Sequence, residues 1–303
     1  MDFKQEFAVI FMLSTLLNNN DNLSLSISKF HNNSIRERVF RDRSNLLEIY
    51  NNEDFISRFR LPKEVILSLT DELAEVLSPA TSRTHSIPAV LQVCTALRFY
   101  ATGSFLNTVG DTVGLSKASV SRVVYRVSRA LSNKLPQFPN QMAEFPNVVG
   151  AIDGTHVRIQ APPAHEHLFV NRKGYHSLNI QAVCDSDLRF LNCVARWPGS
   201  LHHSRILKYS QLCLAFEQGI IDGVLLGDSG YPLKPWLLTP FLNPTTLALR
   251  NYNTAHCSTR NTVERAFGVL KRRFHCLHGE LRMAPDRVCN IICATVVLHN
   301  IAR

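Results

Sequence analysis

Val148-Val149-Gly150-Ala151-Ile152-Asp153-Gly154 is the segment from which the fold of this chain is most easily inferred. It is a short apolar run that ends in an acid and a glycine. A second run, Val224-Leu225-Leu226-Gly227, ends in the same way in Asp228-Ser229-Gly230. Short apolar runs bounded by turn residues are typical of buried strands. We therefore predict two strands, each with a carboxylate at its end.

Asp153 and Asp228 are most informative as a pair. A carboxylate at the end of a buried strand is costly to desolvate without a partner, and two of them on neighbouring strands repel each other. A cation between the two acids would remove both difficulties, which indicates a metal site. The simpler alternative is that one or both acids only cap a turn, as Asp-Gly pairs often do.

The segments around these two runs predict a mixed sheet covered by helices. Alternation of apolar and polar residues predicts further strands, and helical spacing of apolar residues predicts helices. Strands followed by interleaved helices give an α/β fold in which helices pack on the sheet. The predicted strands are Thr155–Ile159, Leu178–Cys184 and Phe190–Trp197, and the predicted helices are Ser204–Gln218, Asn261–Phe274 and Pro285–Ile301.

A third acid, Glu264, lies on the predicted helix Asn261–Phe274. The apolar residues of this helix share one face and Glu264 lies on the other, from which its carboxylate could reach toward the sheet. The alternative is a partner within the helix, Arg260 or Arg265. Cations near the end of the helix are suited to hold a phosphate backbone close to the acids, namely Lys271, Arg272 and Arg273.

The residues before the sheet predict an all-helical region. Helices Phe105–Val113 and Lys117–Leu131 are separated by Gly114-Leu115-Ser116, which is the outline of a helix-turn-helix. The second helix is basic and contains no acid, so we predict that it contacts DNA through Lys117, Arg122 and Arg126. The alternative is an ordinary solvated helix of a bundle.

Three prolines, Pro136, Pro139 and Pro146, mark a boundary near residues 135–147. We predict three regions: an N-terminal arm, partly helical, over 1–60; a helical region with the helix-turn-helix over 61–135; and the sheet-containing domain over 148–301. The apolar run Phe7–Leu17 in the arm is too short to span a bilayer and is predicted as a helix. We therefore expect a soluble protein without a membrane partner.

Composition favours a polyanionic partner, because 33 Lys and Arg outnumber 24 Asp and Glu. Nucleic acid is the first expectation and an acidic membrane surface the second. The eight cysteines lack the spacing of a disulfide scaffold, which favours a reducing compartment. A zinc site built from Cys257, Cys276, Cys289 and Cys293 with nearby histidines is disfavoured, because no Cys-x-x-Cys pair is present.

Four blocks of sequence carry a resemblance to a known family. They resemble the signature blocks of the PIF/Harbinger DDE transposases, a family that includes domesticated, transposase-derived nucleases. The resemblance runs from about Val148 to Ile301 and extends to a helical N-terminal region with a helix-turn-helix. The blocks are Val149–His156, Asn171–His176, Gly227–Pro232 and Thr262–Gly268.

The resemblance implies a ribonuclease H-like catalytic domain in which Asp153, Asp228 and Glu264 are catalytic. These acids would bind two divalent metal ions, Mg or Mn, and the reaction would be hydrolysis or strand transfer at DNA phosphodiester bonds without a covalent nucleophile. Arg172 and Lys173, which lie in the second block, join Lys271 and Arg272 among the residues predicted to bind DNA.

One position departs from the family pattern. The family usually has Pro-Gly-Ser-x-His-Asp-Ser where this chain has Pro198-Gly199-Ser200-Leu201-His202-His203-Ser204. His203 therefore replaces an acid that would be a further metal ligand. A neutral imidazole ligates Zn or Mn but suits Mg poorly. The alternative is that this position does not touch the metal and tolerates the change.

The resemblance also implies partners and a location. We expect double-stranded DNA as substrate, a Myb-like companion protein, residence in the nucleus and also in the cytoplasm, and possible assembly into homo-oligomers. The competing hypothesis is a domesticated DNA-binding or adaptor protein that keeps the fold but no longer cuts. His203 favours this second hypothesis, and the intact acids favour retained catalysis.

Overall fold

The computed structural model describes residues 45–78, 86–135 and 147–303. All described residues belong to one compact unit, Arg41–Arg303. The helix predicted over Phe7–Leu17 and the proline-rich boundary at 136–146 lie outside the described residues. Among the residues described, no helix combines the length and the apolar composition that a membrane crossing requires.

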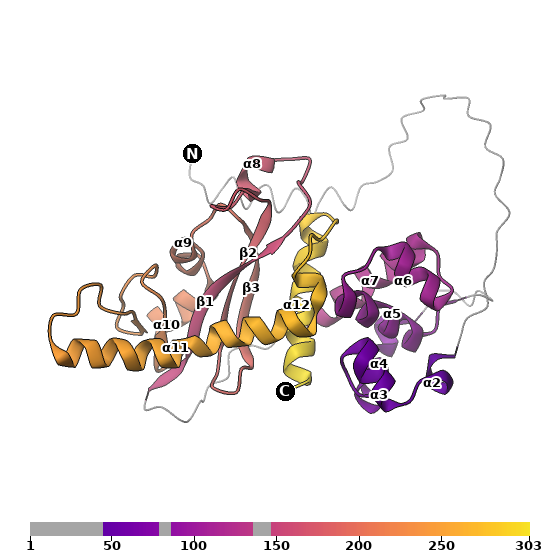
Figure 1. Cartoon of the computed structure of the whole chain (residues 1–303), viewed down its shortest axis with the longest axis horizontal. Helices are drawn as coiled ribbons and strands as arrows, with labels where there is room; N and C mark the ends of the chain where they lie inside the picture. Colours follow the sequence, from indigo (N-terminus) through magenta and orange to yellow (C-terminus); the bar gives the residue numbers. More distant parts are fainter. Residues whose placement is uncertain (1–44, 79–85, 136–146) are drawn as a thin grey trace. The chain divides into compact units, whose positions relative to one another are not determined.

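The first described part is all-helical, as predicted (Figure 1). The helix α5 is buried along nearly its whole length, and the other helices pack around it. Pro88 precedes α5 at its N-cap position. The helices are α2 (Leu46–Ile49), α3 (Asn52–Phe59), α4 (Lys63–Leu77), α5 (Ala89–Thr102), α6 (Leu106–Val113) and α7 (Lys117–Ser132).

Helices α6 and α7 are joined by the predicted glycine turn. Gly114 ends α6 with φ 68°, a left-handed conformation that glycine adopts without strain. Ser116 then caps α7, since its Oγ accepts a hydrogen bond from the Ser119 N–H at 3.2 Å. The valines of α7 are buried, while Lys117, Arg122 and Arg126 are exposed. The two helices are present as expected, and their use in DNA binding stays a prediction.

A five-stranded mixed sheet forms the second described part, in the order β3-β2-β1-β4-β5. Strands β1, β2 and β3 are antiparallel neighbours, whereas β4 and β5 run parallel to β1. The predicted α/β class with a mixed sheet and flanking helices is therefore present. The strands are β1 (Val148–Arg158), β2 (Ser177–Cys184), β3 (Phe190–Pro198), β4 (Val224–Leu226) and β5 (Leu237–Leu238).

The predicted break at Asp153-Gly154 is wrong, because β1 runs through it without interruption. Asp153 pairs with Ala182 and Gly154 with Gln181 in the antiparallel ladder with β2. That long partner strand keeps the two residues extended, although Asp-Gly is locally a turn signal. On the other side of β1, the parallel pairing with β4 ends at Ala151, two residues before Asp153.

The helices around the sheet differ from expectation at two places. The predicted helix Ser204–Gln218 is two helices, because Ser210 starts a new one by accepting a hydrogen bond from the Cys213 N–H. The helix predicted over Asn261–Phe274 begins much earlier, where Thr246 caps it. The helices are α8 (Glu166–Phe169), α9 (His203–Lys208), α10 (Gln211–Glu217), α11 (Leu247–Arg273) and α12 (Pro285–Ile301), with a 3₁₀ turn, η1 (His275–Leu277).

Two hydrophobic clusters cover the two faces of the sheet. The larger includes Ala151 and Val157 of β1 together with residues of α11, α12 and the N-terminal helices, and the smaller includes Ile152 of β1 with residues of α9 and α10. Because side chains alternate along a strand, Asp153 shares the α11 face with Ala151. Figure 1 shows α11 lying across the sheet at β1. This packing brings the polar side of α11 to Asp153.

Candidate active site

Asp153 is held in a partly buried position at the middle of β1. Its side chain is 15% exposed, and the N–H of Gly154 donates a hydrogen bond to its Oδ1 at 2.7 Å. The pKa of Asp153 is raised to about 6, chiefly by burial and to a smaller extent by the charges of Asp228 and Glu264, against the opposing effects of the Gly154 N–H and Arg260. The three predicted acids are therefore close enough to influence one another.

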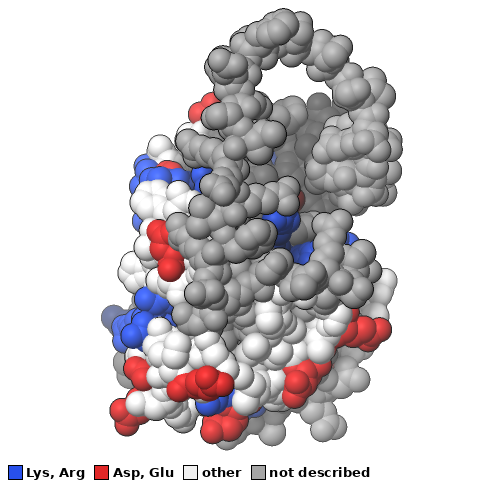
Figure 2. All heavy atoms as spheres, turned by 90° about the vertical axis from the view of Figure 1, so that its right-hand side faces the viewer, with Lys and Arg blue, Asp and Glu red and all other residues white. Residues whose placement is uncertain are grey.

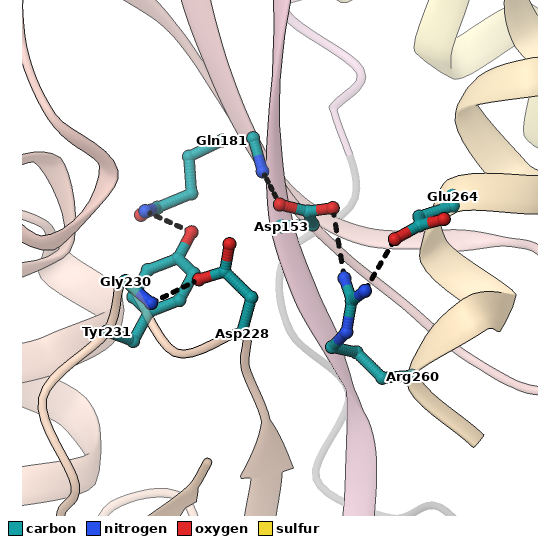
Figure 3. A network of polar contacts seen from close by, with 8 residues as sticks. Asp153, Gln181, Asp228, Gly230, Tyr231, Arg260 and Glu264 are labelled. Carbon is teal, nitrogen blue, oxygen red and sulfur yellow. Dashed lines mark hydrogen bonds and ion pairs between the residues drawn. The ribbon is translucent and has the colours of Figure 1, made fainter. Parts of the chain in front are cut away.

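Asp228 approaches the same place from β4. It lies two residues beyond Leu226, the last β4 residue paired with β1, just as Asp153 lies two residues beyond Ala151. The turn that follows fixes its carboxylate, since the N–H of Gly230 donates to Oδ1 at 3.0 Å. Each of the two parallel strands therefore carries an aspartate two residues after their pairing ends. Figure 3 shows Asp153 and Asp228 at this place. Asp228 does serve a turn, as the simpler alternative proposed, but it also faces Asp153.

Arg260 of α11 joins two of the acids. Its Nη1 lies 3.3 Å from Oδ2 of Asp153, and its Nη2 lies 2.5 Å from Oε1 of Glu264. Burial lowers the pKa of Arg260, but the hydrogen bond to Glu264 and the charge of Asp153 outweigh this effect, so the net pKa is raised. Figure 3 shows the guanidinium between the two carboxylates. Arg260 is one of the two partners within the helix that were considered for Glu264, and it also contacts Asp153 of the sheet.

The donor set fits a divalent cation in chemistry and charge. Carboxylate oxygens are the ligands preferred by hard cations, and three of them meet here with one positive charge among them. As they stand, no three His, Cys, Asp or Glu side chains within the described ranges converge closely enough to hold an ion. The Arg260 guanidinium occupies the position between Asp153 and Glu264 where a cation would satisfy both.

His203 lies near Asp228 and against the backbone of Gly154, the residue that follows Asp153. It is the first residue of α9, and a Cβ added to Gly154 would lie only 2.0 Å from its Nδ1, so its ring packs directly on the β1 backbone. The ring also stacks on Tyr231, with centroids 6.3 Å apart. Burial lowers the pKa of His203, whereas the charge of Asp228 opposes this. The imidazole is therefore neutral at neutral pH, and its buried Nδ1 has no hydrogen-bond partner within the described residues.

Gln181 and Tyr231 support these residues and were not predicted. Gln181 of β2 is buried, and its Nε2 donates to the Tyr231 hydroxyl at 3.0 Å and to the His203 carbonyl at 3.1 Å. Burial raises the pKa of Tyr231, so its hydroxyl stays protonated. A polar residue inside an apolar strand was the available signal for Gln181. Tyr231 belongs to a block quoted for the resemblance, where only its acid was singled out.

Comparisons with known proteins agree with this geometry. Residues 152–300 match the family model described as DDE superfamily endonuclease. The chain is 38% identical over 276 residues to the human protein named "Putative nuclease HARBI1". The matched region covers 84% of this chain and 79% of the human protein. The chain belongs to the DDE endonuclease superfamily. Membership of this superfamily implies a divalent metal.

Other relatives extend the same match. A Xenopus laevis protein of the same name is 35% identical over 267 residues, covering 82% of this chain and 77% of its own length. The Arabidopsis thaliana "Protein ALP1-like" is 32% identical over 243 residues, covering 69% of this chain and 59% of its own length. No solved structure matches the chain. All three acids lie inside the part of the chain, residues 152–300, that the family model matches.

A basic cavity of about 390 Å³ is lined by Gly154, the residue that follows Asp153, and by none of the three acids. Lys271 lines it, and its Nζ donates to Thr155 Oγ1 at 2.8 Å and to the His156 carbonyl at 3.0 Å. Arg172 and Lys173 line the same cavity from the loop after α8, and His203 closes it toward Asp153. The pKa of His156 is lowered to about 4, chiefly by burial and to a smaller extent by neighbouring groups that include Lys271 and Lys173. Positive charge is therefore concentrated in this cavity, next to the residue that follows Asp153.

The other basic residues predicted to bind DNA lie elsewhere. Arg272 is exposed on α11 and does not line the basic cavity. Lys117, Arg122 and Arg126 lie on α7, in the helical part. The zinc alternative gains no support, because all eight cysteines are free thiols and no group of metal ligands forms within the described ranges.

Proposed function

We propose that this protein is a divalent-metal-dependent DNA nuclease that cuts phosphodiester bonds at Asp153, Asp228 and Glu264. The observation that carries the proposal is that Arg260 of α11 pairs with both Asp153 of β1 and Glu264 of α11, while Asp228 after β4 lies near enough for its charge to raise the pKa of Asp153. A sheet with three antiparallel strands followed by two parallel ones supports the finer assignment of a ribonuclease H-like fold.

The acids, with His203 beside them, are the residues that would hold the metal. When bound, a divalent ion supplies a water of lowered pKa and charge stabilisation for the leaving oxygen. The chain's own residues provide the remainder. Lys271, Arg172 and Lys173 bind the phosphate backbone and orient the scissile bond, while Gln181 holds Tyr231 and the start of α9 in place.

Double-stranded DNA is the proposed substrate, because the formal net charge of +9 favours a polyanion and the basic cavity lies next to the acids. Action on DNA entails residence in the nucleus, with the cytoplasm as the place of synthesis. A Myb-like companion protein and homo-oligomerisation remain part of the proposal through the resemblance to the Harbinger family. We propose Mn or Mg as the ion.

The test is metal-dependent cleavage of supercoiled plasmid by the purified chain. We expect nicking with Mn that Asp153→Asn abolishes. The matched control is Asp187→Asn, which changes an exposed aspartate in the turn between β2 and β3 and should cut normally. Nicking that persists in Asp153→Asn, or an absence of cleavage in the unmodified chain with either ion, contradicts the proposal.

A second candidate function is a DNA-binding adaptor without catalysis. His203 favours it, because a neutral imidazole packed on Gly154 and near Asp228 stands where the Harbinger family has an acid. The two candidates make opposite predictions in the same experiment. An adaptor binds DNA in a gel-shift assay and leaves the plasmid intact with every divalent ion.

A further inference from the structure

A second cavity, of about 430 Å³, lies between α4, α7 and α12, away from the acids. Its wall is dominated by arginines, and no acidic side chain lines it. Three of the arginines come from α7 and one comes from α12, the helix that also packs on β3. We call this the arginine cavity and define it by Arg122, Arg126, Arg129, Arg287 and Tyr125.

The arginines of α7 repel one another along one face of the helix. Arg122, Arg126 and Arg129 follow at spacings of four and three residues, where like charges destabilise a helix. Within the described ranges, none of the three forms an ion pair, and Arg122 only donates a 3.5 Å hydrogen bond to the hydroxyl of Ser119. The next cation along the chain differs, since Lys134 is paired with Glu72 at 2.6 Å. An external anion would relieve this repulsion.

Arg287 is held in place at the wall of the cavity. Its Cζ lies 5.0 Å from the centre of the Tyr125 ring, and its Nη1 donates to Ser121 Oγ at 3.3 Å. These contacts orient the guanidinium without neutralising it. A guanidinium fixed in this way loses little conformational entropy when it binds a phosphate with two parallel hydrogen bonds.

We propose that the arginine cavity binds the phosphate backbone of duplex DNA, as a contact site separate from the acids. Figure 2 shows Lys and Arg side chains in several groups on one face of the molecule, with Asp and Glu mainly along its lower edge. The choice of DNA rests on the proposed function. The site adds Arg129 and Arg287 to the predicted DNA contacts, and Lys117 does not line it.

The experiment measures binding without cleavage. Full-length Asp153→Asn protein is titrated into a fluorescent 30-base-pair duplex, without divalent ions, over a series of salt concentrations. Loss of one phosphate contact lowers the slope of log K against log salt by about 0.9. We expect Arg129→Gln to reduce the magnitude of the slope by about one and the double variant Arg129→Gln/Arg287→Gln to reduce it by about two. The reduction should be the same for duplexes of unrelated sequence. The control is Arg189→Gln, which changes an exposed arginine just before β3 and should leave both the affinity and the salt slope unchanged.

Several outcomes overturn the inference. Unchanged slopes in both variants, with normal unfolding curves, exclude a phosphate contact in the cavity. Weaker binding to vesicles containing phosphatidylserine, with DNA binding unchanged, assigns the cavity to a membrane surface instead. If Arg287→Gln destabilises the fold, Arg129→Gln alone still decides, because the Arg129 side chain is exposed and makes no ion pair with another described residue. If the variants show the expected reduced slopes but the unmodified chain shows no Mn-dependent cleavage, the nuclease proposal is refuted and the phosphate contact in the arginine cavity still stands.

Discussion

Arg260 and Asp153 are 107 residues apart in sequence, yet their side chains meet at 3.3 Å across the face of the sheet. The same guanidinium contacts Glu264 one helical turn further along α11. A single cation of the chain therefore offsets the mutual repulsion of the acids when no metal is bound. A metal ion at these acids competes with Arg260 for the same oxygens.

Replacement of Arg260 should strengthen metal binding. Arg260→Gln removes the competing charge, so we expect the affinity for Mn to rise about tenfold, equivalent to about 1.4 kcal/mol. Mn binding is followed by electron paramagnetic resonance of the free ion, which does not depend on cleavage. Arg265→Gln, on the exposed side of the same helix, is the control. Equal or weaker binding by Arg260→Gln would show that the guanidinium does not compete with the ion.

The raised pKa of Asp153 predicts a pH-dependent effect on the metal-free protein. A carboxyl with a folded pKa of about 6 and an unfolded value of 3.8 opposes folding fully above pH 6, and this penalty disappears as the pH falls below 4. Asp153→Asn should therefore stabilise the metal-free protein by about 2–3 kcal/mol at pH 7.5. Urea unfolding in EDTA measures this, and the gain should shrink steadily between pH 6 and pH 4. A gain that is constant with pH contradicts the assignment.

Restoration of an acid at position 203 tests the second candidate function. His203→Asp adds a carboxylate oxygen beside Asp153 and Asp228, and Mg prefers such ligands to imidazole. We expect Mg-dependent nicking to appear or to rise by about tenfold, while Mn-dependent nicking changes less. His202→Asp, one residue earlier, is the matched control. If His203→Asp leaves Mg-dependent nicking unchanged, this side chain does not act on the metal.

The close contact between Gly154 and His203 can be measured by a double-mutant cycle. Gly154→Ala places a methyl group 2.0 Å from the His203 ring, so we expect a loss of about 1–3 kcal/mol in the free energy of unfolding. The loss should largely vanish in a His203→Ala background. Equal losses in both backgrounds would place the strain elsewhere in the strand.

Local patterns in the sequence predicted those parts of the fold that local interactions determine. Ser116 and Pro88 mark the starts of α7 and α5, and the apolar spacing of α12 predicted it residue for residue. The first half of α11 was missed because it buries only His256 before residue 261. The strand β5 was missed because two residues carry too little periodicity.

The candidate site was predictable in composition and not in arrangement. Asp153, Asp228 and Glu264 could be selected from the sequence, but Asp153 was expected at a strand end, because only the pairing with β2 extends β1 beyond it. The pairing of Arg260 with Glu264 follows from a spacing of four residues. Its second contact, with Asp153, depends on how α11 crosses the sheet, and no local pattern encodes that.

The position of α12 has a consequence for synthesis of the protein. This helix packs on α7 and on β3, and Asn290 receives a hydrogen bond from Ser132, 158 residues earlier. Contacts between such distant residues form slowly, because a long loop must first close. The N-terminal helices therefore leave the ribosome long before the helix that completes their core. Until then α7 exposes its apolar side, and we expect nascent chains halted before residue 285 to be strong clients of chaperones.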